Sequence, residues 1–86
     1  MNVIDLIEDI NPDAITIIGD AYNQSIIGIT EDDRVIYDYY KMIDNLMELE
    51  QMEYEEAMEY IEYNIVRAIP YMGELAPIIM YKLTEE

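Results

Sequence analysis

A run of carboxylates in the second half of the chain is the feature best suited to chemistry. Between Met42 and Val66 the sequence has eight Asp and Glu residues and no Lys or Arg. Glu55, Glu59 and Glu62 follow the i, i+4, i+7 spacing that puts side chains on one side of a helix, with neighbours about 5–6 Å apart. This separation is close to that of successive phosphates on a nucleic acid strand. The three carboxylates could therefore bind a basic surface that normally holds nucleic acid.

The same carboxylates could also serve only to keep a helix soluble. A helix built for solubility usually has Lys and Arg among its acids, and like charges four residues apart destabilise a helix slightly. Both interpretations stay open at the level of the sequence. The residues that we expect to contact a partner are four of the acids and two tyrosines beside them: Glu48, Glu55, Glu59, Glu62, Tyr60 and Tyr63. The two tyrosines could instead cover the edge of the core, with their hydroxyls at the surface.

A different function is suggested by the only cations of the helical half, Lys41 and Arg67. Together with stacking tyrosines they could hold a small nucleotide-like signal, so a ligand-sequestering protein is the alternative hypothesis. The strongly negative field around each cation favours a different role, in which it neutralises neighbouring carboxylates instead of binding an anionic ligand. A pocket that converges on both cations would favour ligand binding, whereas a convex acidic surface would favour mimicry of nucleic acid.

Catalysis is disfavoured by the side chains that the chain lacks. There is no His for proton transfer near neutral pH, no Cys nucleophile, and no His to activate Ser25, the only serine. The three glycines are scattered and form no phosphate-binding loop. The acids at 31–33 and 55–56 do not follow the spacing of a calcium loop. We therefore expect a protein that is not an enzyme and has no cofactor or metal.

The overall charge restricts the class of partner. Twenty acidic and four basic residues give a formal net charge of −16 on 86 residues. Such a field repels phosphate backbones and anionic lipid and attracts basic proteins. The sequence is nevertheless 52% hydrophobic, which predicts one folded domain over residues 1–86. The N-terminus lacks the basic region of a signal peptide and no apolar run has membrane-spanning length, so we expect a cytoplasmic protein.

Hydrophobic periodicity and turn residues predict an α+β fold in the order α-β-β-β-α-α-β. The predicted helices cover residues 3–10, 39–50 (capped by Asp38) and 54–68, and the predicted strands cover 14–18, 25–30, 35–37 and 77–83. We expect a small, mainly antiparallel sheet packed against the two long helices. The predicted core of these helices is Met42, Ile43, Leu46, Met47, Ala57, Met58, Ile61 and Ile65. Asn64 is expected to be buried on the same side, and Gly28 to mark a bulge or a close backbone approach.

The amino-acid sequence resembles those of a group of small proteins encoded in tailed-phage and prophage genomes. The resemblance covers roughly residues 20–83 and rests on five stretches: 37–43 (YDYYKMI), 52–57 (MEYEEA), 59–64 (EYIEYN), 67–73 (RAIPYMG) and 76–79 (APII). It implies an accessory protein that acts inside a bacterial cell. Such proteins commonly bind and block a host factor, and acidic ones often do so by imitating nucleic acid. The resemblance thus favours an inhibitor of a host defence protein, of the anti-CRISPR or anti-restriction kind, over an oligomerising structural phage protein.

The surplus of Ile and Met in so small a domain predicts self-association. A chain of this size has a marginal core and often completes its burial in a symmetric dimer. The repulsion between two chains of −16 each opposes this association. We expect a homodimer in spite of it.

Overall fold

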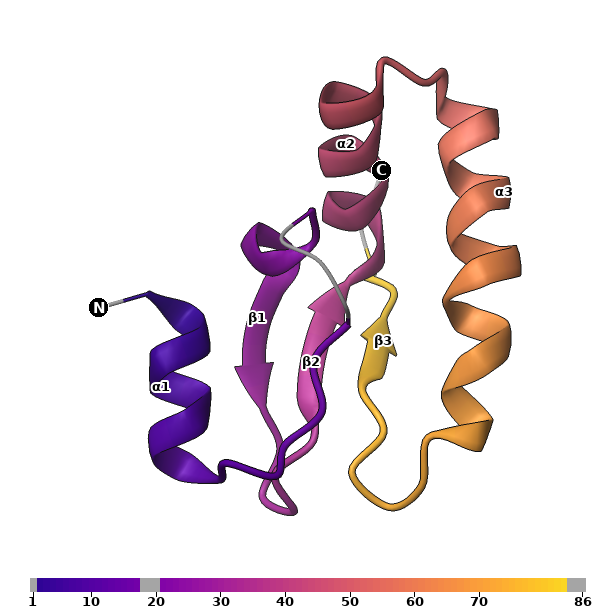
Figure 1. Cartoon of the computed structure of the whole chain (residues 1–86). Helices are drawn as coiled ribbons and strands as arrows, with labels where there is room; N and C mark the ends of the chain where they lie inside the picture. Colours follow the sequence, from indigo (N-terminus) through magenta and orange to yellow (C-terminus); the bar gives the residue numbers. More distant parts are fainter. Residues whose placement is uncertain (1, 18–20, 84–86) are drawn as a thin grey trace.

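The computed structural model describes residues 2–17 and 21–83 of the chain (Figure 1). These residues form a small α+β fold, and its elements in chain order are α1 (Val3–Ile10), the 3₁₀ helix η1 (Asn23–Ser25), β1 (Ile26–Ile29), β2 (Val35–Asp38), α2 (Tyr39–Glu50), α3 (Tyr54–Asn64), the 3₁₀ helix η2 (Val66–Tyr71) and β3 (Ile78–Met80). Within the described ranges no helix is both long and apolar enough to cross a membrane.

The three strands form a mixed sheet in the order β1-β2-β3. β1 and β2 are antiparallel, but β2 and β3 are parallel, so the prediction of a mainly antiparallel sheet is only partly right. Figure 1 shows the reason: α2 continues away from the end of β2, and α3 returns along the whole length of the molecule. The chain therefore re-enters the sheet at the end where β2 began. Parallel neighbours require a long crossover of this kind, which usually contains helix.

The predicted strand over residues 14–18 is wrong for the part that the structure describes. Residues 14–17 have no regular secondary structure, and Ile18 lies outside the described residues. Instead of pairing with a strand, the backbone N–H of Ile17 donates a hydrogen bond to the hydroxyl oxygen of Tyr37, at 2.9 Å. A side chain of β2 thus satisfies the buried N–H group that a sheet would otherwise bond. The described element order is α-β-β-α-α-β.

The helix predictions are confirmed most closely at α2, which begins and ends at the predicted residues. Its cap is Asp38, whose carboxylate accepts hydrogen bonds from the N–H groups of Tyr40 and Lys41. The second long helix is shorter than predicted. The α-helix ends at Asn64, and the chain continues as the tighter turns of η2, which include Pro70.

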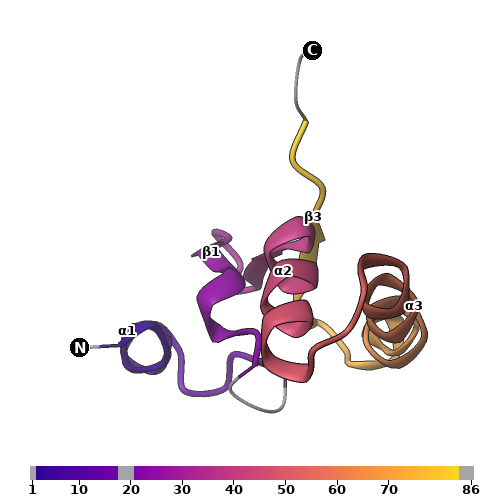
Figure 2. The ribbon, with the colours of Figure 1, turned by 90° about the horizontal axis from the view of Figure 1, so that it is seen from above.

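The core lies on one side of the sheet. Figures 1 and 2 show α1, the segment at 11–17 and α3 on this side. The predicted helix core is confirmed: six of its members are buried, and the other two, Met47 and Met58, are half-buried against it. Asn64 is an error of the prediction, because it is exposed and its side-chain amide donates to the carbonyl of Tyr60, one turn back on the same helix.

Candidate partner-binding surface

The exposed side of α3 has a row of carboxylates, Glu55, Glu59 and Glu62, which we call the acidic ridge. All three side chains are exposed. Opposite them Ala57 and Ile61 are fully buried in the core, which fixes the rotation of the helix. The ridge therefore stands on a helix whose inner side is anchored, and its charges keep a constant spacing of about one helical turn.

One end of the ridge is also held by a hydrogen bond to α2. The hydroxyl of Tyr39 donates to Oε1 of Glu62 at 3.0 Å. Tyr39 is only 5% exposed, and its ring packs against those of Tyr40 and Tyr81. Burial, followed by the neighbouring Glu62 carboxylate, raises the pKa of the Tyr39 hydroxyl well above its ordinary value. The hydroxyl thus stays protonated and available as a donor to the ridge.

The two predicted tyrosines are neighbours on one flank of α3, at i and i+3, but only one of them adjoins the ridge. Tyr63 is 71% exposed and lies one turn from Glu59, so it borders the ridge. The guanidinium of Arg67 covers its ring at 4.7 Å from the ring centroid. Tyr60, one turn before Tyr63 and nearer the buried side of the helix, lines an apolar hollow of about 390 Å³ together with Tyr22 and Ile17. Tyr60 therefore covers the core edge, whereas Tyr63 extends the ridge.

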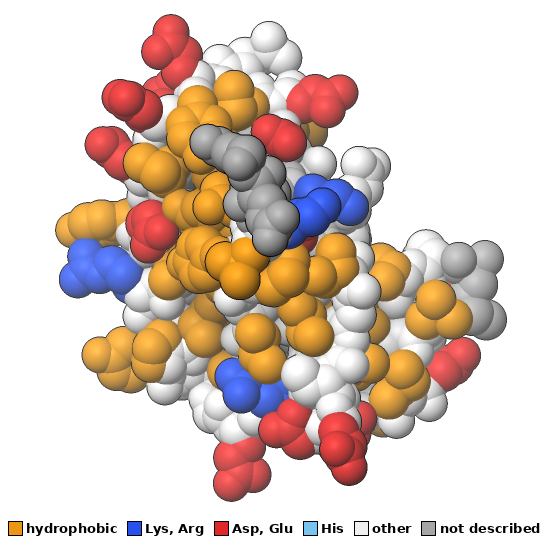
Figure 3. Space-filling view, turned by 180° about the vertical axis from the view of Figure 1, so that it is seen from behind, with side chains coloured by type: hydrophobic (Ala, Val, Ile, Leu, Met, Phe, Trp, Pro, Cys, Tyr) orange, Lys and Arg blue, Asp and Glu red, His pale blue; other side chains and the backbone are white. Residues whose placement is uncertain are grey.

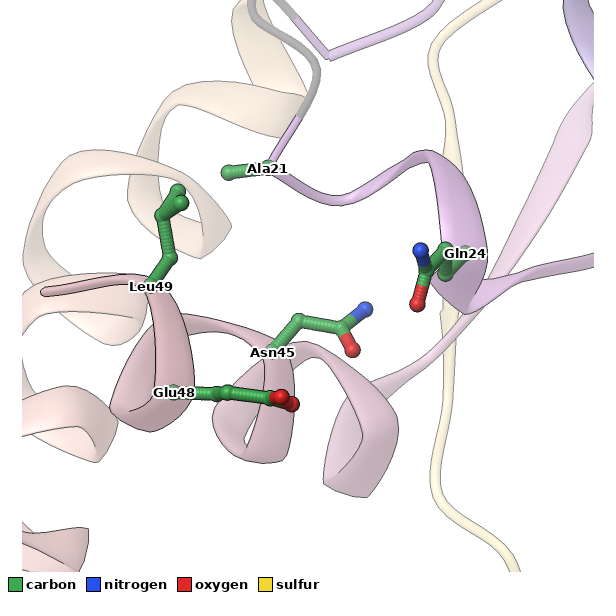
Figure 4. A pocket seen from close by; sticks show the side chains of 5 residues that line it. All are labelled: Ala21, Gln24, Asn45, Glu48 and Leu49. Atoms are coloured by element: carbon green, nitrogen blue, oxygen red, sulfur yellow. The ribbon is translucent and has the colours of Figure 1, made fainter.

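Glu48 is placed apart from the ridge, on α2. It lines a second hollow of about 390 Å³ with Ala21, Gln24, Asn45 and Leu49. Figure 4 shows the amides of Gln24 and Asn45 directed into this hollow, and Asn45 is fixed by donating to the hydroxyl of Ser25 at 2.7 Å. The residues that line this hollow come from α2 and from the segment around η1. The structure thus does not join Glu48 with the three carboxylates of α3.

Lys41 and Arg67 do not converge. Lys41 is exposed in the first turn of α2, and Arg67 is exposed on η2, where it covers Tyr63. Neither cation lines any of the four hollows of about 280–400 Å³ found among the described residues. The expectation that each neutralises a carboxylate fails too, since in the described part of the chain neither forms an ion pair. Among these described residues, neither cation is therefore ion-paired with a carboxylate of the ridge.

The acids of the turn between β1 and β2 have local structural partners. Asp32 accepts a short hydrogen bond from the Thr30 hydroxyl, which lowers the pKa of its carboxyl. Asp33 has a left-handed backbone (φ 64°) and accepts from the side-chain amide of Asn11 at 3.1 Å. Among the described residues no group of three or more acidic side chains is arranged to hold a metal ion. These acids shape the hairpin and tie it to α1.

Sequence reasoning missed a second surface, on the side of the sheet away from α1 and α3. Ile27, Ile36, Ile78 and Met80 lie there without packing against the core cluster. The sequence does contain a sign of this surface, because the strand segments are apolar at consecutive positions, as in Ile78-Ile79-Met80. In a sheet with one face exposed to solvent, apolar and polar residues would alternate instead. Tyr40 and Tyr81, which follow β2 and β3 along the chain, are both about half exposed, and both rings pack against Tyr39.

Comparisons with protein families, with curated proteins and with solved structures find no match to this chain. Its function is therefore inferred from the geometry.

Proposed function

We propose that this protein is a non-enzymatic inhibitor that binds a basic, nucleic-acid-binding protein through the acidic ridge. The observation that carries the proposal is the state of the ridge. Glu55, Glu59 and Glu62 are all exposed, and they stand on one flank of a helix that has no Lys or Arg. A groove lined by Lys and Arg for a phosphate backbone would meet carboxylates at a repeating spacing on a fixed support.

The support matters because binding is stronger when the groups are already in place. Ile61 anchors the inner side of α3, and the hydrogen bond from Tyr39 holds Glu62. A partner would therefore lose little free energy in ordering these side chains. The long-range field of a chain of −16 would in addition accelerate the encounter with a basic protein.

The resemblance to tailed-phage accessory proteins gives the proposed setting, the cytoplasm of an infected bacterium. There the target would be a defence nuclease or a similar protein, and the inhibitor would be of the anti-CRISPR or anti-restriction kind. The ligand-sequestering alternative has no comparable support, because neither Lys41 nor Arg67 lines any of the four hollows found in the described part of the chain.

The test begins with capture of proteins from a bacterial lysate by the immobilised chain, at low and at high salt. Captured basic proteins are then purified, loaded with a fluorescent oligonucleotide, and titrated with the chain while anisotropy is measured. We expect the chain to displace the oligonucleotide, and the displacement to weaken steeply as salt rises. The alternative predicts no displacement.

The decisive variant replaces the three ridge carboxylates by Gln (Glu55→Gln, Glu59→Gln, Glu62→Gln). Its control, Glu8→Gln, Asp9→Asn and Asp13→Asn, removes the same charge from exposed positions in and just after α1. We expect the ridge variant to need about tenfold more protein for half displacement, mostly through slower association. The control variant should behave like the wild type. Equal displacement by the ridge variant and the wild type would refute the proposal.

A further inference from the structure

On one side of the sheet none of the described elements forms a covering layer. The register pairs Ile36 with Gly28 on β1 and with Ile78 on β3, so these residues share one side, opposite to that of Val35 and Tyr37. Ile27, the extra residue of the bulge in β1, and Met80 belong to the same side. We call Ile27, Ile36, Ile78 and Met80 the open sheet face. In Figures 1 and 2 none of the described helices covers it.

The open sheet face is apolar and accessible. Ile27 is 45% exposed, and Ile36, Ile78 and Met80 are half-buried without joining the core cluster. Seen from behind, hydrophobic side chains gather over the middle of the molecule (Figure 3). The segment that follows β3 leaves the body on the same side (Figure 2), and its Leu83 is 94% exposed. Contiguous apolar surface of this kind marks an interaction site.

The charges around this face differ from those of the rest of the surface. The only carboxylate in the three strands, Asp38, is buried and caps α2. Three of the four cations lie within three residues of a strand end: Arg34 before β2, Lys41 after it, and Lys82 after β3. In Figure 3 Lys and Arg lie both next to the hydrophobic groups and at the outline, while most visible acids lie towards the outline. On a strongly acidic protein, this is the side on which two copies repel each other least.

The accessible surface of the whole chain is larger than that expected for a compact monomer of its mass. The chain has an accessible surface of 6170 Å², whereas a compact monomer of 10.2 kDa should have about 5,300 Å². The excess of about 900 Å² is close to the roughly 800 Å² that each partner buries in a standard interface. It includes the segment after β3, which projects on this side.

We infer that two copies of this chain form a symmetric dimer through their open sheet faces, and that this dimer is independent of the acidic ridge. The partner that fits must be apolar in the middle and must have carboxylates at the rim to meet Arg34, Lys41 and Lys82. The chain's own face has this pattern, with its cations near the strands and its acids towards the outline. A two-fold axis would place each set of cations near the acidic rim of the other copy.

Sedimentation equilibrium is the first test, because it gives the mass directly. We expect twice the chain mass of 10.2 kDa at micromolar concentration, with tighter association as salt screens the repulsion. This salt dependence is opposite in sign to that of binding at the ridge, so the failure of one proposal is distinguishable from the failure of the other. A mass of 10.2 kDa at all concentrations and salts would overturn the dimer.

A matched pair of variants locates the interface. Ile36→Thr with Ile78→Thr keeps β-branched residues in the strands and makes the open sheet face polar. Leu6→Gln with Ile10→Gln removes apolar side chains that are 50% and 55% exposed on α1. We expect the dimer dissociation constant to rise at least about tenfold in the first variant and to stay unchanged in the second. Circular dichroism checks that both fold, and equal effects of the two variants would overturn the assignment.

A spin-label measurement tests the geometry without removing any apolar contact. The chain has no cysteine, and a Cβ added at Gly28 meets no atom within 4 Å, so Gly28→Cys gives one labelled site on the open sheet face. Packed sheets lie about 10 Å apart, so two labels in the dimer should give a short, defined distance by pulsed electron resonance. Glu8→Cys on α1 is the control, with a longer expected distance. A shorter distance for Glu8→Cys than for Gly28→Cys would contradict this interface.

Discussion

The acidic ridge and the open sheet face are opposite in chemistry although both are accessible. The ridge is a line of carboxylates on a helix whose inner side is fully buried. The open sheet face is apolar, with three of the four cations near its strands. Salt weakens attraction to a basic partner but relieves repulsion between two acidic copies. One small chain can therefore have two binding surfaces that respond to salt in opposite directions.

The largest expected effect separates the residues beneath the ridge from those of the open sheet face. Ile61→Ala should lower the free energy of unfolding by about 2–5 kcal/mol, because it leaves a cavity under α3. Ile78→Ala should cost only about 1 kcal/mol in the monomer, since Ile78 is half-buried and outside the core cluster. Urea unfolding at low protein concentration measures both.

Protein concentration sharpens this comparison. In the dimer Ile78 is covered, so the cost of Ile78→Ala should grow as the protein concentration rises, while that of Ile61→Ala should not. If Ile78→Ala and Ile61→Ala lower the free energy of unfolding by similar amounts at every protein concentration, Ile78 is buried in the monomer and the sheet has no open face.

Alkaline pH should destabilise the core side of the molecule. Burial raises the pKa of Tyr22 to about 12 from an ordinary value of 10.0 and also raises that of Tyr37. A raised pKa in the folded state means that the neutral form is favoured there. The resulting stability is complete below pH 10 and is lost as pH rises towards 12.

The check is urea unfolding across this pH range for the wild type and for Tyr22→Phe. The variant should lose less stability between pH 10 and pH 12, because Phe cannot ionise. Tyr63→Phe, at a position that is 71% exposed, should follow the wild type. If both variants lose stability as the wild type does, burial of Tyr22 is not the cause.

The smallest effect concerns the ridge itself. Replacing Glu55, Glu59 and Glu62 by Gln removes repulsion along α3 and should raise the free energy of unfolding by a few tenths of a kcal/mol at low salt. Gln retains helix propensity and can still accept the hydrogen bond from Tyr39. The gain should vanish at high salt. A clear loss of stability would show that the three carboxylates stabilise the fold. Their presence would then be explained by a structural role, without a binding partner.

The predictions from sequence are confirmed where neighbouring residues determine the local structure. The bounds of α2 follow from its apolar spacing and from Asp38, a capping residue in its ordinary place. The bulge expected at Gly28 is found between Ile26 and Gly28, although nothing approaches the glycine closely. Each of these features is determined by residues within one or two turns of one another.

The predictions from sequence are wrong where contacts between distant parts of the chain determine the structure. The parallel pairing of β3 depends on how far α3 runs back past α2, which no local pattern contains. Residues 14–17 have strand-like composition, but the N–H of Ile17 donates to a tyrosine hydroxyl of β2 and that of Ala14 to the carbonyl three residues earlier, so neither N–H pairs with the backbone of a strand. Within the candidate site, exposure of the ridge could be predicted from helical spacing. The position of Tyr60 relative to the ridge follows from the same helical spacing. The separation of Glu48 from the ridge could not be predicted, because it depends on how α2 and α3 are placed.

The bulge in β1 has a consequence for how assembly stops. A sheet with a regular free edge can add strands from further molecules without limit, which is the route to fibres. Here the ladder of β1 is interrupted between Ile26 and Gly28, and the strand at the other edge has only three residues, Ile78–Met80. Neither edge offers an uninterrupted template to an incoming strand. A chain that is rich in isoleucine along its strands can thus remain in solution as discrete particles instead of polymerising edge to edge.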